Sequence, residues 1–537
     1  METDCSKDAA TRVETVAACV LAALLVSGCG GGGGGDAGTA PAAAIDDPPE
    51  TPQPAPLPPS PEPTEELDIE LHGLIDALGM TGNASNGRNL PSIDDPIPQL
   101  GMSLFFSKSL GGGFDAACVS CHHPLLGGSD ELSLSVGTGT VDPDVLGIGR
   151  QRPDGLPNVP RNSPTIFNVG LHDSGLFWDS RVESLDRGER LNGAGAGIRT
   201  PDTAYFVADA FAGTNLTAAQ ARFPVTSSEE MKTETFESGS DNDAIRAHLA
   251  ARIGNYGIGA GELSTNEWLA GFQTAFASAL PADQLISFEY IALALGEYQR
   301  SMVFIDSPWK AYVEGDFDAI SESAKRGALL FLNTSEDDGF GCVQCHSGDF
   351  FSNGEHHTIG FPQIGPGKGD GNDDDFGRER ETGLTDDRYR FRTPSLLNVA
   401  VTGPYGHAGA YATLDEVVRH YDNQNGTVNN FFDDGGWCQL PQFVGLANCE
   451  TLYPDAENNT DAALAKVNRE QRNLPDDEAL PNININNGER RDVIEFLEAL
   501  TDPCVEDANC LAPWIATPGP GPDDMQLNAV TAAGDPL

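Results

Sequence analysis

Two copies of the pattern Cys-x-x-Cys-His constrain this chain more than any other feature. They read CVSCH at 118–122 and CVQCH at 342–346. Two thiols at this spacing can form thioethers to one edge of a haem, and the His that follows then lies under the iron as the proximal ligand. A thioredoxin-like redox pair or half of a zinc site needs no His there, and neither explains two copies. The pattern therefore predicts two covalently bound haem c groups, held by Cys118, Cys121 and His122 and by Cys342, Cys345 and His346.

The N-terminus has the composition of an export signal. An apolar run at 16–28 is too short to span a bilayer stably, and Cys29 follows it in a Val-Ser-Gly-Cys sequence that resembles a bacterial lipobox. We predict a lipoprotein-type signal peptide over residues 1–28, lipidation at Cys29, and a Gly/Pro-rich linker over 29–66. A plain secretory signal is the alternative. Both place the protein in the periplasm or cell envelope, and lipidation would anchor it to the outer membrane.

The chain is strongly acidic, with 81 acidic and 31 basic residues and a net charge of −50. Nucleic-acid binding needs basic patches that neutralise phosphates, so we expect no nucleic-acid partner. The acidity favours solubility, or the attraction of cations and basic proteins.

Four cysteines outside the two motifs form two local pairs, Cys438 with Cys449 and Cys504 with Cys510. An exported chain can form disulfides. We therefore predict two disulfides that staple loops, and a different pairing among the four is the alternative.

Helical patterns surround both motifs. The apolar spacing predicts helices over 97–106, 282–303, 321–333 and 487–501. Ser321 is expected to cap the third of these. Connections such as 364–377 are too polar to be core. The predicted fold class is mainly α, with two cytochrome c-like haem domains and long irregular loops.

One haem motif lies in each half of the chain, which sets the expected domain organisation. We place an N-terminal haem domain at 67–305 and a C-terminal haem domain at 306–515. Residues 516–537 are rich in Pro, Gly and Asp and are predicted to be a disordered tail.

An ordered set of further motifs accompanies the haem sites. They are RNSPT (161–165), LFWDSRVESL (176–185), Glu230-Met231, DFGR (375–378) and FRTPSLLNVAVTGPYGHAGAYATLDEVV (391–418). In this order, across roughly residues 90–512, they resemble the bacterial dihaem cytochrome c peroxidase/MauG family. The resemblance implies that hydrogen peroxide reacts at the N-terminal, peroxidatic haem and that the C-terminal haem relays electrons or shares oxidising equivalents.

In many members of this family a distal His blocks the first haem, from the segment after its motif. Here residues 133–144 contain no His, and His123 directly follows the proximal ligand, so it is poorly placed to reach the opposite face. We expect a five-coordinate or water-bound first haem, the alternative being a His from elsewhere. The resemblance implies that Glu230 moves a proton between the peroxide oxygens and that Trp178 relays electrons. Glu229 is the alternative acid. The ordinary explanation for either glutamate is surface acidity, and for Trp178 it is core packing.

The family also holds a calcium ion between its two domains. The positions that match its protein ligands are Asn162, Thr402 and Pro404. Oxygen ligands suit a hard cation. This calcium site is implied by the resemblance alone.

The sixth ligand of the second haem is expected to differ from that of a conventional peroxidase. In a conventional peroxidase of this family the sixth ligand is a Met, but no Met lies between Met302 and Met525 in this chain. An ungapped count from His407 places the family's ligand position at Tyr421, where MauG-type proteins have a Tyr. His420 is the rival ligand, and because adjacent helix residues point about 100° apart, only one of the two should face the iron. An open site is the remaining alternative.

Together these features predict an enzyme, a peroxide-dependent dihaem oxidoreductase of haem-peroxidase type. Its partners would be hydrogen peroxide and either a small electron-donor protein or a protein substrate whose side chain is oxidised. The missing distal His and the missing Met favour the oxidation of a protein side chain. A non-catalytic dihaem electron-transfer cytochrome is a second hypothesis, which Glu230 and the open first haem oppose. A dihaem oxygenase is a third, and it would need a large apolar channel.

Overall fold

The computed structural model describes residues 63–368, 371–475 and 479–537. The predicted signal peptide, Cys29 and all of the predicted linker before residue 63 lie outside these residues. Within them, no helix is long and apolar enough to cross a membrane.

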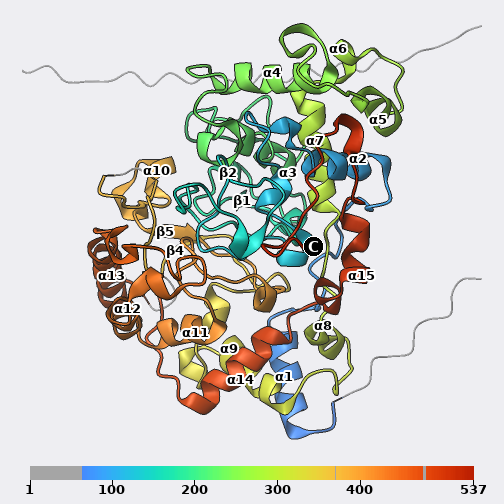
Figure 1. Ribbon diagram of the computed structural model, residues 1–537. Coiled ribbons are helices and arrows are strands. Elements are labelled where there is room, and N and C mark those ends of the chain that lie inside the picture. The colour runs from blue at the N-terminus through green and yellow to red at the C-terminus, as the bar shows by residue number, and fades with distance from the viewer. Residues whose placement is uncertain (1–62, 369–370, 476–478) are drawn as a thin grey trace, which may run out of the picture. The chain divides into compact units, whose positions relative to one another are not determined.

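The described chain is mainly helical, as predicted, with short strands and long irregular connections (Figure 1). The α-helices are α1 (Glu66–Ala77), α2 (Pro96–Phe105), α3 (Leu216–Gln220), α4 (Asn242–Gly254), α5 (Trp268–Ala275), α6 (Ala282–Leu285), α7 (Phe288–Arg300), α8 (Pro308–Val313), α9 (Glu322–Leu332), α10 (Glu379–Thr382), α11 (Leu414–Asp422), α12 (Gln424–Asp433), α13 (Ala456–Asn473), α14 (Asn487–Glu498) and α15 (Ala508–Leu511). Two small antiparallel sheets are formed by β1 (Gly175–Leu176), β2 (Val182–Ser184) and β3 (Ile198–Arg199), and by β4 (His356–Thr358) and β5 (Arg390–Arg392).

Three of the four predicted helices form as single helices, α2, α9 and α14. The Oγ of Ser321 accepts a hydrogen bond from the amide of Ala324 at 3.1 Å, so the expected cap of α9 is present. The fourth, predicted over 282–303, is divided into α6 and α7. Ile286 has ψ of 89° and Ser287 is extended, which interrupts the helical hydrogen bonds between them.

The first hydrophobic core surrounds the packed pair α2 and α7. A Cβ on Gly101 of α2 would lie 1.9 Å from the carbonyl oxygen of Ala294 on α7, so this close approach requires glycine. Leu104, Phe105 and Tyr298 are almost completely buried at the contact. This core includes the chain that leads into the first haem motif.

The second core is built on α9 and α14, and Figure 1 shows α1 beside them. The chain passes from the first core to the second between Phe304 and Ile305 and returns to the first core at Val505. Leu71 and Ile75 of α1 belong to the second core, although the predicted N-terminal domain begins at residue 67. A linear boundary cannot describe this, because α1 crosses to the other core.

Residues 516–537 are ordered, which corrects the prediction of a disordered tail. The carboxylate of Asp523 accepts hydrogen bonds from Trp268 Nε1 at 2.8 Å and from Ser107 Oγ at 2.9 Å. Leu527 is 1% exposed, and its amide donates to the carbonyl of Phe106 at 2.7 Å. Composition suggested disorder, but one buried leucine and one buried carboxylate are enough to fix the segment on the first core.

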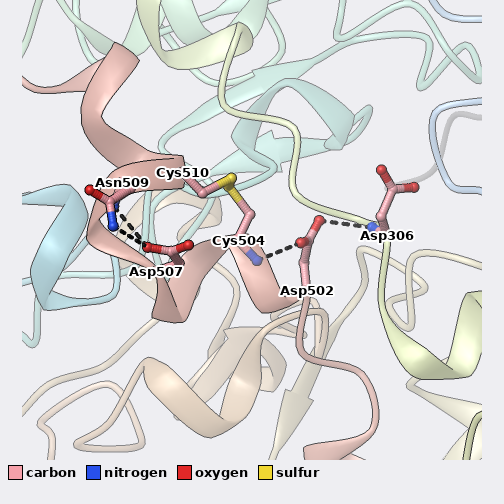
Figure 2. Close-up of a disulfide and its surroundings, with 6 residues drawn as sticks. All are labelled: Asp306, Asp502, Cys504, Asp507, Asn509 and Cys510. Atoms are coloured by element: carbon pink, nitrogen blue, oxygen red, sulfur yellow. Dashed lines mark hydrogen bonds between the residues drawn. A yellow bond between two sulfur atoms is a disulfide. The ribbon is translucent and has the colours of Figure 1, made fainter.

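Both predicted disulfides are present, Cys438–Cys449 and Cys504–Cys510. Figure 2 shows the second, with the carboxylate of Asp502 next to it. This carboxylate accepts hydrogen bonds from the amides of Cys504 at 2.9 Å and of Asp306 at 2.8 Å. The disulfide loop is thereby hydrogen-bonded to the segment at Asp306, where the chain passes from the first core to the second.

Candidate active site

The first haem motif lines a cavity with an empty volume of about 1190 Å³, open solvent included. Residues 118–120 form one 3-10 turn, which brings both thiols and the following His to the same cavity. Neither Cys118 nor Cys121 is in a disulfide. The Nδ1 of His122 lies 3.3 Å from the carbonyl oxygen of Gly128.

The second motif repeats this arrangement in a larger cavity of about 1980 Å³, again with open solvent included. Its turn spans residues 342–344, and Cys342 and Cys345 are both free thiols. The Nδ1 of His346 lies 3.0 Å from the carbonyl oxygen of Phe351.

Both cavities fit a covalently attached haem. A carbonyl oxygen can only accept a hydrogen bond, so Nδ1 of His122 and of His346 carries the proton and Nε2 would bind the iron. The hydroxyl of Ser163 also lies close to the ring of His122, 3.1 Å from Nδ1 and 3.4 Å from Nε2. Burial lowers the pKa of each His to about 4, so both rings are neutral, as a metal ligand must be. The two free thiols beside each ring supply the attachment points.

One wall separates the two cavities, and Trp178 is part of it. Trp178 lies in the turn between β1 and β2, lines both cavities, and donates from Nε1 to the carbonyl of Asn162 at 2.9 Å. Arg392 of β5 also lines both, and its amide donates to the carbonyl of Trp178 at 2.8 Å. The small sheets therefore place an indole ring between the two candidate haem sites.

Glu230 is the carboxylate of the first cavity. It lies in a single π-helical turn, Ser228–Lys232, and its Oε1 is 3.9 Å from Nη2 of Arg181. Glu229 is exposed, accepts a hydrogen bond from Ser227, and does not line the cavity. Of the two acids considered from the sequence, only Glu230 lines the cavity.

Two histidines of the described residues line the first cavity, His122 and His172. The guanidinium of Arg392 donates to Nδ1 of His172 at 3.2 Å, so the proton of the neutral ring is on Nε2 and neither nitrogen is free to bind iron. His123 is 1% exposed, and its Nδ1 accepts from the amide of Leu125. No described His is therefore prepared to block this cavity.

Arg161 is a buried cation at the centre of the motif segments. Its guanidinium donates to Asp179 at 2.6 Å and to both oxygens of Asp375 at 2.6 and 2.7 Å. Burial alone would raise the pKa of Asp375, but the charge of Arg161 outweighs it and lowers this pKa to about 2. The three segments that carry these residues are thus held by one charge network.

Tyr421 and His420 lie in different surroundings on α11. Tyr421 lines the second cavity together with the haem motif. His420 is fully buried, with Nδ1 2.9 Å from the hydroxyl of Tyr411 and Nε2 2.9 Å from the carbonyl of Ile359. Both of its nitrogens are occupied, so it is not available as a ligand. No Met is among the described residues that line this cavity.

Comparison with known proteins agrees with this geometry. The sequence profile of a family described as di-haem cytochrome c peroxidase matches residues 97–318. The chain is 28% identical over 322 residues to the methylamine utilization protein MauG of Methylorubrum extorquens, covering 60% of this chain and 67% of that protein. It is 28% identical over 329 residues to the cytochrome c551 peroxidase of Pseudomonas aeruginosa, covering 61% and 71%. The chain resembles the dihaem cytochrome c peroxidase/MauG family over about three fifths of its length.

On this likeness, the protein is a peroxide-dependent oxidoreductase of haem-peroxidase type that carries haem c. Among solved structures, it is similar to the diheme peroxidase BthA from Burkholderia thailandensis, with a TM-score of 0.48 and 20% identity, covering 82% of this chain and 91% of that one.

Three residues that line the first cavity of this dihaem peroxidase were not found from the sequence. His172 and Arg392 are distant in sequence and meet only within the wall between the cavities. Lys368 comes from the polar connection 364–377, which was predicted to lie outside any core. That prediction is wrong in part, because Ile364 and Asp375 of this connection are buried.

Proposed function

We propose that this protein is a MauG-like member of the family, in which peroxide enters an open first haem site and the second haem is bound by His346 and Tyr421. The observation that carries the proposal is the contrast on α11, where Tyr421 lines the second cavity and His420 is engaged on both nitrogens. A phenolate is a hard anionic ligand that favours higher oxidation states of iron. Such a second haem would suit the oxidation of a protein side chain better than uptake of electrons from a cytochrome.

In this proposal Glu230 handles the proton of bound peroxide. Its carboxylate lines the first cavity and has Arg181 as its only ion-pair partner among the described residues. It would take a proton from one peroxide oxygen and return it to the other, which lets the O–O bond break with water as the leaving product. The haem, when bound, supplies the electrons for this cleavage. Trp178, in the wall between the cavities, would carry charge from one site to the other.

The remaining parts of the proposal concern a metal ion and location. Asn162, Thr402 and Pro404 all line the second cavity, which supports a calcium ion at their oxygens. We place the protein in the periplasm or cell envelope on the strength of its export signal, with Cys29 as the candidate lipid anchor. Hydrogen peroxide is the proposed oxidant, and a small donor protein or a protein substrate the partner.

The test is to add hydrogen peroxide to the fully oxidised protein and record optical and EPR spectra. We expect reaction without prior reduction. Glu230→Gln should slow it about 10²- to 10⁴-fold, whereas the matched Glu229→Gln should not. Tyr421→Met should change the spectrum of the second haem to that of a His/Met pair, and Tyr290→Met, at an exposed position, should not. If peroxide reacts only after one of the two haems has been reduced, the proposal is refuted. If peroxide does not react at all, an electron carrier is favoured.

A further inference from the structure

Lys368 reaches the first cavity from the other half of the sequence. It follows the second haem motif by 22 residues, yet its side chain lines the cavity of the first motif with Glu230 and Arg181. Neither the haem motif nor the segments that carry the family resemblance include it. Its position depends on the connection that holds it.

That connection is fixed on both sides of Lys368. Ile364 shares a buried cluster with Leu134, in the segment 133–144 that contains no His. The side chain of Gln363 accepts a hydrogen bond from the amide of Asp375 at 2.9 Å, which joins the two ends of the loop. Gly367 has φ of +55°, and a Cβ there would lie 2.4 Å from a backbone oxygen of Asp373. The backbone therefore turns sharply just before Lys368 and directs it toward the first cavity.

No described carboxylate forms an ion pair with the ammonium of Lys368, although the charges of Glu230 and Asp179 favour its protonated form. Glu230 is nearest to Arg181, and Asp179 is bound by Arg161. Lys368 takes part in none of the ion pairs or hydrogen bonds formed within the described part of the chain. Burial, and then the charges of Arg181 and Arg161, lower the pKa of Lys368 to about 8, so it is still mostly protonated at neutral pH. A partly buried cation without an ion-pair partner is costly, and a small anion in the cavity would relieve that cost.

We propose that Lys368 makes the first haem cavity a binding site for small anions, and that it holds an anionic ligand of the iron, such as hydroperoxide, beside Glu230. This deepens the proposed function, because it assigns a residue that recognises the charged form of the oxidant. A fixed ammonium at this place also stabilises negative charge that develops on a departing oxygen. The segment that lacks a blocking His is thus covered by a loop that supplies a charge.

The experiment measures the affinity of the oxidised, haem-loaded protein for azide at pH 7 from the optical shift of the haem. Imidazole serves as a neutral ligand. Lys368→Met should weaken azide binding about ten- to a hundredfold, the range of a charged hydrogen bond, and leave imidazole binding within about twofold. Lys368→Arg should keep most of the azide affinity. Lys310→Met removes the same charge far from the cavity and should have no effect.

Equal azide affinities in the wild type and Lys368→Met would overturn the proposal, as would a parallel loss of imidazole binding or no azide binding by the wild type. Haem content and melting temperature identify a variant that fails to fold, and Lys368→Gln then replaces it. Failure of the proposed function is separable. A protein that does not react with peroxide but loses azide affinity in Lys368→Met would refute the peroxide role and keep the anion site.

Discussion

Asp375→Asn tests the buried network that holds the motif segments together. In the wild type Arg161 lies between Asp179 and Asp375, and both carboxylates are almost completely buried. Asparagine keeps the size of the side chain and removes its charge. Arg161 then keeps a single carboxylate partner, in surroundings where a buried charge depends on such partners.

The size of the effect follows from the pKa of Asp375. The native pKa is about 2 against an ordinary value of 3.8, so the ionised group contributes about 2 kcal/mol at pH 7. Because the native pKa is the lower one, this contribution is present above about pH 4 and is lost as the pH falls toward 2. Asp375→Asn should therefore be less stable than the wild type by about 2 kcal/mol at pH 7 and by about half of that at pH 3.

The assay is urea unfolding followed by circular dichroism at both pH values. Asp373→Asn is the matched control, since Asp373 is exposed and only two residues away. It should change the free energy of unfolding by less than about 0.5 kcal/mol. A difference between Asp375→Asn and the wild type that stays constant from pH 7 to pH 3 would refute the reasoning, because it would show that the charge of Asp375 is not the source of the stability.

Two further predictions concern the wall between the cavities and the C-terminal segment. Trp178→Phe removes the hydrogen bond to Asn162, so it should cost about 1 kcal/mol and slow the appearance of oxidation at the second haem in stopped-flow spectra, unlike Trp437→Phe. Deletion of 516–537 exposes the site of Leu527 and leaves Trp268 without its acceptor. It should lower the melting temperature by about 5–10 °C in calorimetry, and an unchanged melting temperature would contradict the packed tail.

Local patterns predicted the parts of the site that local chemistry determines. Each haem motif has five residues built on one short 3-10 turn, and its cysteines and histidine share a cavity because that turn places them together. The cap at Ser321 and both disulfides are similarly short-range. The predictions that were wrong concern segments held by long-range contacts. The polar connection 364–377 and the tail are held by partners on distant segments, so their composition carried no signal of their burial.

The choice of ligand for the second haem could not be made from the sequence alone, because it depends on contacts between distant segments. Helical geometry established that Tyr421 and His420 point in different directions, but not which one faces the cavity. The direction is set by the two partners of His420, Tyr411 and the backbone of Ile359, the latter 61 residues away. A neutral imidazole that donates from one nitrogen and accepts at the other is fully satisfied there. Turning it toward the second cavity would break both hydrogen bonds.

Contacts between distant segments also connect Arg161 to the first cavity. Asp375 ends the loop that begins at Gln363, and its amide donates to the side chain of that residue. The carboxylate of Asp375 is in turn fixed by Arg161. Lys368 lies between these two ends, so the ion pair that stabilises the fold also sets where the ammonium sits. Loss of the charge at Asp375 should therefore reach the anion site as well, although Asp375 itself does not line the first cavity.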